Sequence, residues 1–218
     1  QFDKAYTEGI TKLTTADVNY AEALGYRIKH LGVARRTENG VELRVHPTLI
    51  PADRLIANVN GVMNAVMVHG DAVGSTLYYG AGAGAEPTAS AVVADIIDVV
   101  RTLTTDPTNR VPHLAFQADA LSDLPVLPVD EVETAYYLRL HAQDRPGVLA
   151  KVATILSERG INIESIMQKD VEEQDGLVPM ILLTHRVREQ NMNDAIAALE
   201  SLEDIAGPLM RIRVEQLD

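Results

Sequence analysis

The chain of 218 residues contains no cysteine, and this absence excludes disulfides, thiol nucleophiles and thiolate metal sites together. It has no apolar run approaching the roughly 18 to 20 residues that cross a bilayer, and no basic segment precedes an apolar one at its start. Basic residues are few, 19 Lys and Arg against 31 Asp and Glu, so the net charge of −12 would repel a phosphate backbone. We therefore expect a cytoplasmic protein that binds neither membranes nor nucleic acid.

The composition is that of a globular protein, with 46% hydrophobic and 23% charged residues, and the length suits two domains. Four prolines between residues 107 and 128 indicate a linker. We place the domains at residues 1–106 and 131–218, with the linker over 107–130. The chain begins with Gln1 instead of Met, and we expect it to be a fragment of a longer protein.

The first half has the pattern of a mixed, largely antiparallel sheet with few helices. A short helix is predicted over 16–24 and two strands over 26–36 and 41–49, joined at Asn39-Gly40, which tolerates the positive φ of a type I′ turn. Further strands are predicted over 62–69 and 75–79. A helix rich in Ala, Val and Ile should begin at Pro87, end at Arg101 and be buried on more than one face.

The second half alternates in the order strand, helix, strand, strand, helix, strand, which is the ferredoxin-like βαββαβ arrangement. The predicted elements are 136–142, 146–159, 162–170, 177–187, 191–202 and 209–215. The fold class is therefore α+β throughout.

A strand of the second half ends in Asp144-Arg145-Pro146-Gly147 and leads directly into a helix. Such a turn presents free backbone N–H groups, which can bind a small carboxylate with help from the helix dipole. Asn162 opens the next strand and can face this loop. An alternative interpretation is that the turn only starts the helix.

These motifs resemble the ACT domain, the amino-acid-sensing module of amino-acid-metabolism enzymes, over residues 135–215. The resemblance implies that two such domains pair side by side and hold an amino-acid effector between them. It implies that one unit contributes four residues and that the partner closes the pocket with two more: Asp144, Gly147, Val148 and Leu149, then Asn162 and Ile163. ACT domains can also keep the fold without the ligand, in which case this domain would only dimerise.

Three glycines alternate in the segment from Tyr79 to Pro87, at positions 80, 82 and 84. They allow the backbone to approach a ligand or another part of the chain closely. Their spacing differs from the Gly-x-Gly-x-x-Gly fingerprint of dinucleotide-binding domains, which this sequence lacks.

This segment, with others over 7–13, 43–51, 58–65 and 70–75, resembles the later part of the catalytic domain of homoserine dehydrogenase, and the resemblance covers residues 1 to about 104. It implies an enzyme that interconverts homoserine and aspartate 4-semialdehyde with NAD or NADP, in the biosynthesis of threonine, methionine and isoleucine. Threonine is the effector that it favours. It also implies a homo-oligomer, a dimer or larger, that associates through the catalytic sheet and the ACT domains.

The resemblance assigns cofactor contacts to Gly82, Gly84 and Ala85, and it implies that the following helix packs on a nucleotide-binding domain. A glycine turn needed only for that packing is the alternative. The family's nucleotide-binding domain and its catalytic Asp and Lys have no counterpart here. We therefore expect no catalytic residue in this chain, and neither cofactor binding nor dehydrogenase activity from the chain alone.

His46, His69, His141 and His185 lack the spacing of metal ligands, and we expect no metal site. Two other functions stay open at this point. One is a separate regulatory chain that senses an amino acid, and the other is a structural oligomerisation fragment.

Overall fold

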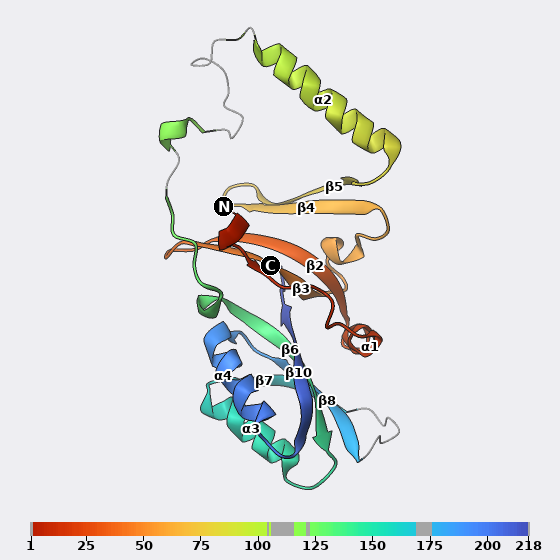
Figure 1. Cartoon of the computed structure of the whole chain (residues 1–218), viewed down its shortest axis with the longest axis vertical. Helices are drawn as coiled ribbons and strands as arrows, with labels where there is room; N and C mark the ends of the chain where they lie inside the picture. Colours follow the sequence, from red (N-terminus) through yellow and green to blue (C-terminus); the bar gives the residue numbers. More distant parts are fainter. Residues whose placement is uncertain (1, 104, 106–115, 121–122, 169–175, 218) are drawn as a thin grey trace. The chain divides into compact units, whose positions relative to one another are not determined.

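The computed structural model describes residues 2–103, 105, 116–120, 123–168 and 176–217 (Figure 1). Contacts divide the chain into unit 1, residues 1–57 and 124–218, and unit 2, residues 58–123. The division into 1–106, 107–130 and 131–218 stays a prediction, and part of its linker, 107–115 and 121–122, lies outside the described residues. None of the helices in the described part of the chain has the length and apolarity needed to cross a membrane.

Unit 1 is built on an eight-stranded sheet with the path β1-β3-β10-β6-β8-β7, in which β2 pairs with β3 and β9 with β6. The strands are β1 Tyr6–Thr7, β2 Tyr26–Arg36, β3 Val41–Pro51, β6 Glu133–Gln143, β7 Ile163–Met167, β8 Leu177–Thr184, β9 Val187–Arg188 and β10 Ile205–Val214. The helices are α1 Thr15–Ala23, α3 Val148–Glu158 and α4 Glu189–Glu200, with the 3-10 helices η1 Phe2–Lys4, η2 Leu55–Asn58 and η4 Val129–Glu131. Among the strands of the described residues, the parallel pairs are β1 with β3 and β3 with β10, so the predicted α+β fold with a mixed, largely antiparallel sheet is confirmed.

The predicted ferredoxin-like order is also confirmed, as β6-α3-β7-β8-α4-β10. The strand predicted over 177–187 is divided, since β8 ends at Thr184 and the short β9 turns to pair with the start of β6. The strand predicted over 162–170 is shorter, and its last two residues lie outside the described ones.

Both faces of the sheet are covered, and β6 supplies side chains to each. On one face Tyr136 and Leu138 belong to a core that includes residues of α3 and α4, among them Val152 and Leu199. On the other face Tyr137 packs with Tyr20 and Ala21 of α1. Because successive strand residues point to opposite faces, a strand covered on both sides is apolar along most of its length.

Strands β3 and β10 join residues that lie far apart in the sequence, with Arg213 paired to Thr48 and Val214 to Leu49. The polar positions of β3 are the buried ones: Glu42, Arg44, His46 and Thr48. The apolar positions between them, from Val41 to Val45, are only half-buried. A strand can bury polar groups in this way only where each finds a partner; here they bind one another, and Arg44 also binds Glu215, the residue after β10.

The hairpin predicted at Asn39-Gly40 is present, but the predicted type I′ turn is wrong. Strands β2 and β3 pair from Arg36 and Val41 outward. The φ of Asn39 is not positive, as a type I′ turn would require. Gly40 has φ +154°, and a Cβ there would lie 2.4 Å from the carbonyl oxygen of Pro125. The turn adapts to this later segment, whose Val126 bridges to Val41.

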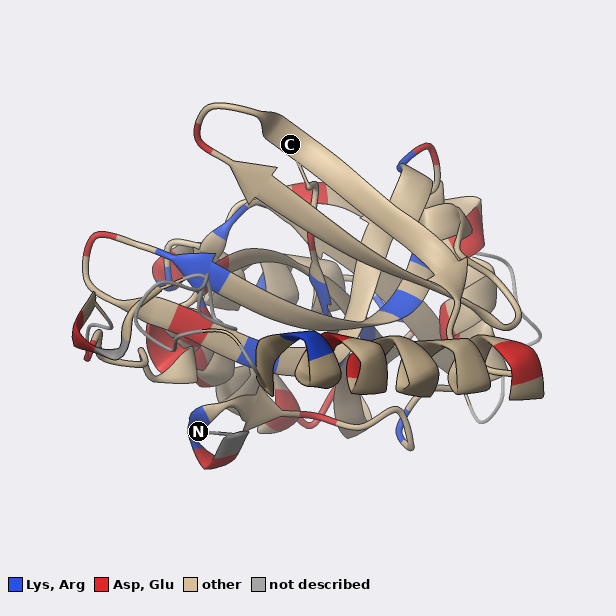
Figure 2. Ribbon diagram, turned by 90° about the horizontal axis from the view of Figure 1, so that it is seen from above, with Lys and Arg blue, Asp and Glu red and all other residues tan. Residues whose placement is uncertain are grey.

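Unit 2 contains the antiparallel hairpin of β4 Met63–Gly70 and β5 Gly74–Ala81, then α2 Ala85–Leu103 and the 3-10 helix η3 Ala118–Ala120. Helix α2 begins two residues before the predicted start at Pro87. Proline is accommodated because the first-turn amides of a helix have no intrahelical acceptor. The predicted burial of this helix is wrong for the described chain, in which no residue of α2 is buried. Figure 2 shows few charged residues along it.

Candidate functional site

The loop between β6 and α3 is the turn for which the sequence predicts carboxylate binding. Gly147 caps α3 with φ +93°, a conformation that favours glycine, and a Cβ built on it would meet no atom within 4 Å. The amides of Leu149 and Ala150 have no acceptor among the described residues. The loop therefore offers open space next to two free N–H groups.

Two cations next to this loop are already paired with Asp204. Arg145 donates to Oδ1 from Nε at 2.8 Å, and Lys151 donates to Oδ2 from Nζ at 2.6 Å. Hydrogen bonds from Lys151 and Arg145 lower the pKa of Asp204. The backbone carbonyl of Asp204 also accepts a bond from Gln143, so Asp204 fixes both ends of the loop.

The predicted effector residues differ in what they offer to a ligand. Asp144 is exposed, and its amide donates to Gly176. Leu149 is 41% exposed and can touch a ligand, whereas the Val148 side chain is 3% exposed and lies in the core with α4.

Asn162 and Ile163 do not meet this loop within one chain. Strands β6 and β7 both run antiparallel to β8, where Gln143 pairs with Leu177 and Ile163 with Thr184. The loop and Asn162 are therefore at opposite ends of β8. The expectation that Asn162 faces its own chain's loop is wrong, because the strand that follows it runs parallel to β6.

The glycine segment of unit 2 lies between β5 and α2, and Gly82 fits closely against β4. A Cβ on Gly82 would lie 1.6 Å from Nδ2 of Asn64, whose exposed side chain would have to move aside. Gly84 has φ +124°, and its carbonyl accepts the Thr88 amide in the first turn of α2. The amides of Ala85 and Glu86 have no acceptor among the described residues, and they are the groups here that suit contact with a dinucleotide.

Sequence reasoning missed two buried ionic groups that connect the N-terminal strands to the ACT strands. In one, Arg44 donates from Nη2 to Glu215 at 2.6 Å and to Glu42 at 3.1 Å. In the other, Arg213 binds Glu189 through Nε at 2.9 Å and Glu8 through Nη1 at 3.0 Å. The available signal was polar alternation in both 42–48 and 211–215.

The electrostatics of these groups favour the ionised forms of Glu189 and Glu215. Burial alone would raise the pKa of Glu189, but its bonds with Arg213 outweigh burial and hold that pKa below its usual value. Burial would likewise raise the pKa of Glu215, and the charges of Arg44 and Arg35 lower it.

His46 is buried beside the first ionic group, and burial together with the charge of Arg213 lowers its pKa to about 4. Arg44 can only donate, so Nε2 of His46 accepts its bond at 3.0 Å and the proton lies on Nδ1, facing the Pro47 carbonyl at 3.1 Å. The histidine is therefore a packed neutral residue. Within the described residues no group of three or more metal-ligating side chains comes together.

A third buried contact connects α1 to the ACT sheet. Asp17 is fully buried and accepts from Nε of Arg139 at 2.7 Å and from the Tyr137 hydroxyl at 3.2 Å. The same carboxylate accepts the backbone amide of Thr14 at 2.9 Å, which completes a capping box at the start of α1.

Comparison with known proteins finds a matching family model for each of the two parts of the chain. A model of the homoserine dehydrogenase family matches residues 1–97, and a model of the ACT domain matches residues 136–204. The chain matches the C-terminal half of homoserine dehydrogenases. Homoserine dehydrogenase of Pseudomonas aeruginosa is 81% identical over 218 residues, and that of Neisseria gonorrhoeae is 54% identical over 216 residues.

A solved homoserine dehydrogenase structure, from Thiobacillus denitrificans, has 63% identity and a TM-score of 0.91 with this chain. The match covers 100% of this chain and 49% of that one. The Pseudomonas and Neisseria homoserine dehydrogenases are covered to 50% and 49%. The chain therefore spans about half the length of these relatives.

Proposed function

We propose that this chain is the C-terminal half of an NAD(P)-dependent homoserine dehydrogenase, which interconverts L-homoserine and L-aspartate 4-semialdehyde in the cytoplasm. The observation that carries the proposal is the succession of a homoserine dehydrogenase match over 1–97 and an ACT match over 136–204 in one chain. We assign it to the biosynthesis of threonine, methionine and isoleucine. The chain alone is inactive in this proposal, because it has no counterpart of the family's catalytic Asp and Lys.

The cofactor contact is assigned to the first turn of α2, where Gly82, Gly84 and Ala85 would bring backbone close to the dinucleotide. The nicotinamide accepts or donates the hydride when it is bound. The two free amides at this turn support the assignment. The exposed apolar side chains of α2 suit packing on a nucleotide-binding domain: Val92, Val93, Ile96, Ile97, Val99 and Val100.

A chimera tests this function. The 218 residues are joined to the N-terminal half of the Pseudomonas aeruginosa enzyme, and homoserine-dependent reduction of NAD and of NADP is followed by absorbance. We expect activity from the chimera and none from the chain alone. A folded chimera without activity would contradict the proposal, and activity of the chain alone would contradict the assignment of catalysis to another segment.

The ACT domain in this proposal binds an amino acid, threonine in the first instance, as a feedback effector. Asp144, Gly147, Val148 and Leu149 would form one side of the site, and Asn162 and Ile163 of a second copy would form the other. The opposite positions of these two groups along β8 favour this arrangement, because a two-fold side-by-side pairing brings one copy's Asn162 to the other's loop.

Threonine binding to the chain by calorimetry tests the effector site. Gly147→Asp adds a side chain and a negative charge where a carboxylate would bind, and we expect it to abolish binding. Gly160→Asp is the matched control, because Gly160 follows α3, has φ +71° and has equally open space around it. Binding that survives in Gly147→Asp would place the threonine elsewhere, and loss in both variants would point to a folding defect.

A further inference from the structure

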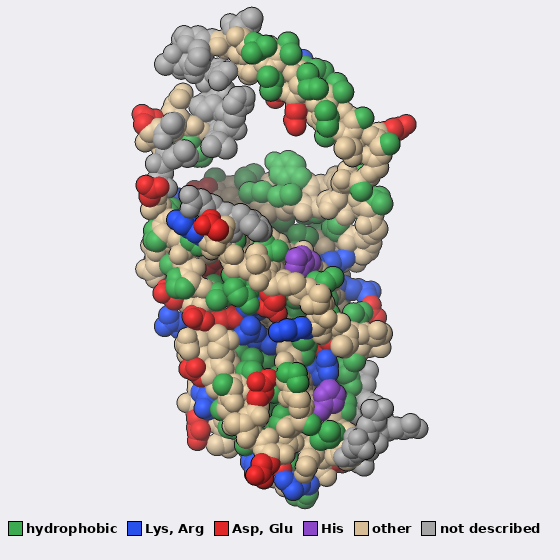
Figure 3. Space-filling model, in the orientation of Figure 1, with side chains coloured by type: hydrophobic (Ala, Val, Ile, Leu, Met, Phe, Trp, Pro, Cys, Tyr) green, Lys and Arg blue, Asp and Glu red, His purple; other side chains and the backbone are tan. Residues whose placement is uncertain are grey.

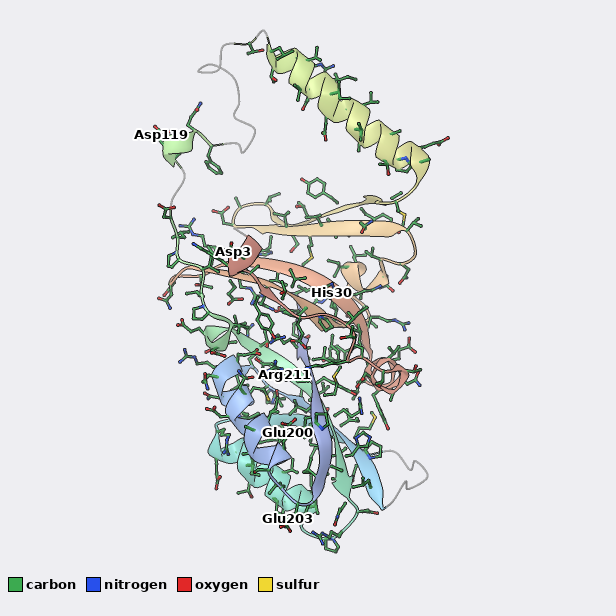
Figure 4. All side chains as sticks on the ribbon, in the orientation of Figure 1. Asp3, His30, Asp119, Glu200, Glu203 and Arg211 are labelled. Carbon is green, nitrogen blue, oxygen red and sulfur yellow. The ribbon has the colours of Figure 1, made fainter. Side chains whose placement is uncertain are left out.

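A cleft of about 310 Å³ lies on unit 1, and no residue of the Gly147 loop lines it. It is lined by the segment after β1, by α4 and by β10, with Glu8, Lys12, Ile196, Glu200, Leu209 and Arg211 among its residues. Figure 4 shows Glu200 and Arg211 on the side of unit 1 formed by α4 and β10. Its volume is at the lower end of the range for small-molecule sites.

The cleft contains charged groups of both signs that still have free bonding capacity. Lys12 is exposed and has no ion-pair partner in the described chain. Glu200 uses Oε1 to accept the Leu209 amide at 2.8 Å, which leaves Oε2 free of partners among the described residues. Arg211 also lines the cleft and is 18% exposed; its Nη1 binds Asn193 and Glu189, and its Nη2 has only a long contact, 4.0 Å, with Oε2 of Glu8.

These groups exclude several classes of ligand. Glu8 and Glu200 would repel a phosphate or a dicarboxylate, and Lys12 and Arg211 would repel a polyamine. Ile196 and Leu209 are partly buried hydrophobic residues at the edge of the ACT core, and they form an apolar wall. Figure 3 shows basic and acidic side chains interspersed over the face in view, without a patch of one sign. A small zwitterion with an aliphatic group satisfies all three features.

We propose that this cleft binds a free aliphatic L-α-amino acid, with its carboxylate on Lys12 and Arg211, its ammonium group on Glu200 and its side chain against Ile196 and Leu209. The site is separate from the proposed effector site at Gly147 and does not depend on it. The ligand would touch both the segment after β1 and the ACT elements α4 and β10, so it would hold together parts of unit 1 that match different families.

The test uses the full 218-residue chain and calorimetry with L-valine as the probe. Two valine analogues serve as controls: isobutylamine lacks the carboxylate, and 3-methylbutanoate lacks the ammonium group. Each analogue loses one set of charged hydrogen bonds, so we expect each to bind at least about tenfold more weakly than valine. Glu200→Gln keeps an oxygen for the Leu209 amide and removes the charge, and Lys12→Met keeps the length of the side chain.

We expect valine binding to weaken at least about tenfold in Glu200→Gln and in Lys12→Met. Glu203→Gln is the matched control, since Glu203 is exposed, lies near Glu200 in the sequence and does not line the cleft. Gly147→Asp should also bind valine normally, which separates this site from the effector site. The proposal is overturned if valine does not bind, if both analogues bind as tightly as valine, or if binding is lost in Gly147→Asp and kept in Glu200→Gln.

Discussion

Asp17 is the residue on which α1 depends for its attachment to the ACT sheet. The Asp17→Ala substitution leaves Arg139, which is 13% exposed, and the Tyr137 hydroxyl without their acceptor, and it also opens the capping box at Thr14. We expect the free energy of unfolding, measured with urea at pH 7, to fall by about 3–5 kcal/mol. Glu22→Ala at the exposed pair with Arg27 is the control, and its cost should stay below about 1 kcal/mol. Equal costs for the two variants would contradict the burial of the Asp17 contact.

His46 should make the stability of the protein depend on pH in mildly acidic solution. Its pKa is about 4 in the folded protein and 6.5 ordinarily, so the unfolded chain takes up the proton first as the pH falls. The contribution of neutral His46 to the free energy of unfolding is fully present above pH 6.5. It is lost progressively down to about pH 4, a loss on the order of 3 kcal/mol. Urea unfolding between pH 7.5 and 4.5 measures the slope.

His46→Asn should reduce that slope, and His185→Asn, at an exposed histidine, is the matched substitution for comparison. The acids that bind arginine add a separate loss at lower pH. The pKa values of Asp17, Glu189 and Glu215 are all lowered in the fold, so their stabilisation is present above their ordinary values and is lost as the pH falls below them. If the free energy of unfolding of His46→Asn still falls as strongly between pH 7.5 and 5, groups other than His46 cause the pH dependence.

At the scale of elements, the turn between β5 and α2 places Gly82 against the exposed side chain of Asn64. Gly82→Ala would force Asn64 into another rotamer, and because that side chain is exposed and can move, we expect a cost below about 1 kcal/mol, seen as nearly unchanged amide hydrogen exchange in the β4–β5 hairpin. Gly80→Ala is the control, since a Cβ there meets no atom within 4 Å. A larger loss of protection that adding Asn64→Ala does not relieve would contradict this and place the constraint in the backbone.

Local patterns predicted most elements, because their causes lie within a few residues. The hairpin at Gly40, the helix that ends before Gly160 and the order of the ACT elements all follow from such signals. The parallel pairing of β3 with β10 could not be predicted in this way, since it joins residues about 165 positions apart. The alternating polar residues of 42–48 also indicate a strand with one exposed face, unless it is known that residues of opposite charge pack against that face. The position of Asn162 was missed for a similar reason, since it depends on the direction of β7 relative to β6.

At the scale of the whole molecule, the sheet crosses the boundary between the two family matches. Strand β3 lies in the homoserine dehydrogenase match, the ACT match ends at Asp204 before β10 begins, and β10 joins β3 to β6 in one hydrogen-bonded sheet. Arg213 extends from β10 to Glu189 at the start of α4 and to Glu8 beside β1. Unit 1 therefore has no internal surface at which the two families could separate without breaking this sheet.

We expect unit 1 to unfold as one cooperative structure, and Arg213→Met tests this. Removing the guanidinium takes from buried Glu189 its bonds with Arg213 but leaves it paired with Arg211 and with the Tyr136 hydroxyl, so the cost should be about 1–3 kcal/mol. Native-state hydrogen exchange measures the protection of the slowest amides, such as those of Leu49 and Ile50 in β3 and Leu138 and Leu140 in β6. If the strands open together, all these amides should lose protection equally. Amides of β4 and β5 in unit 2 should be unaffected. A loss confined to β6 would mean that β3 and the ACT strands open independently, and the continuous sheet would then carry no coupling between them.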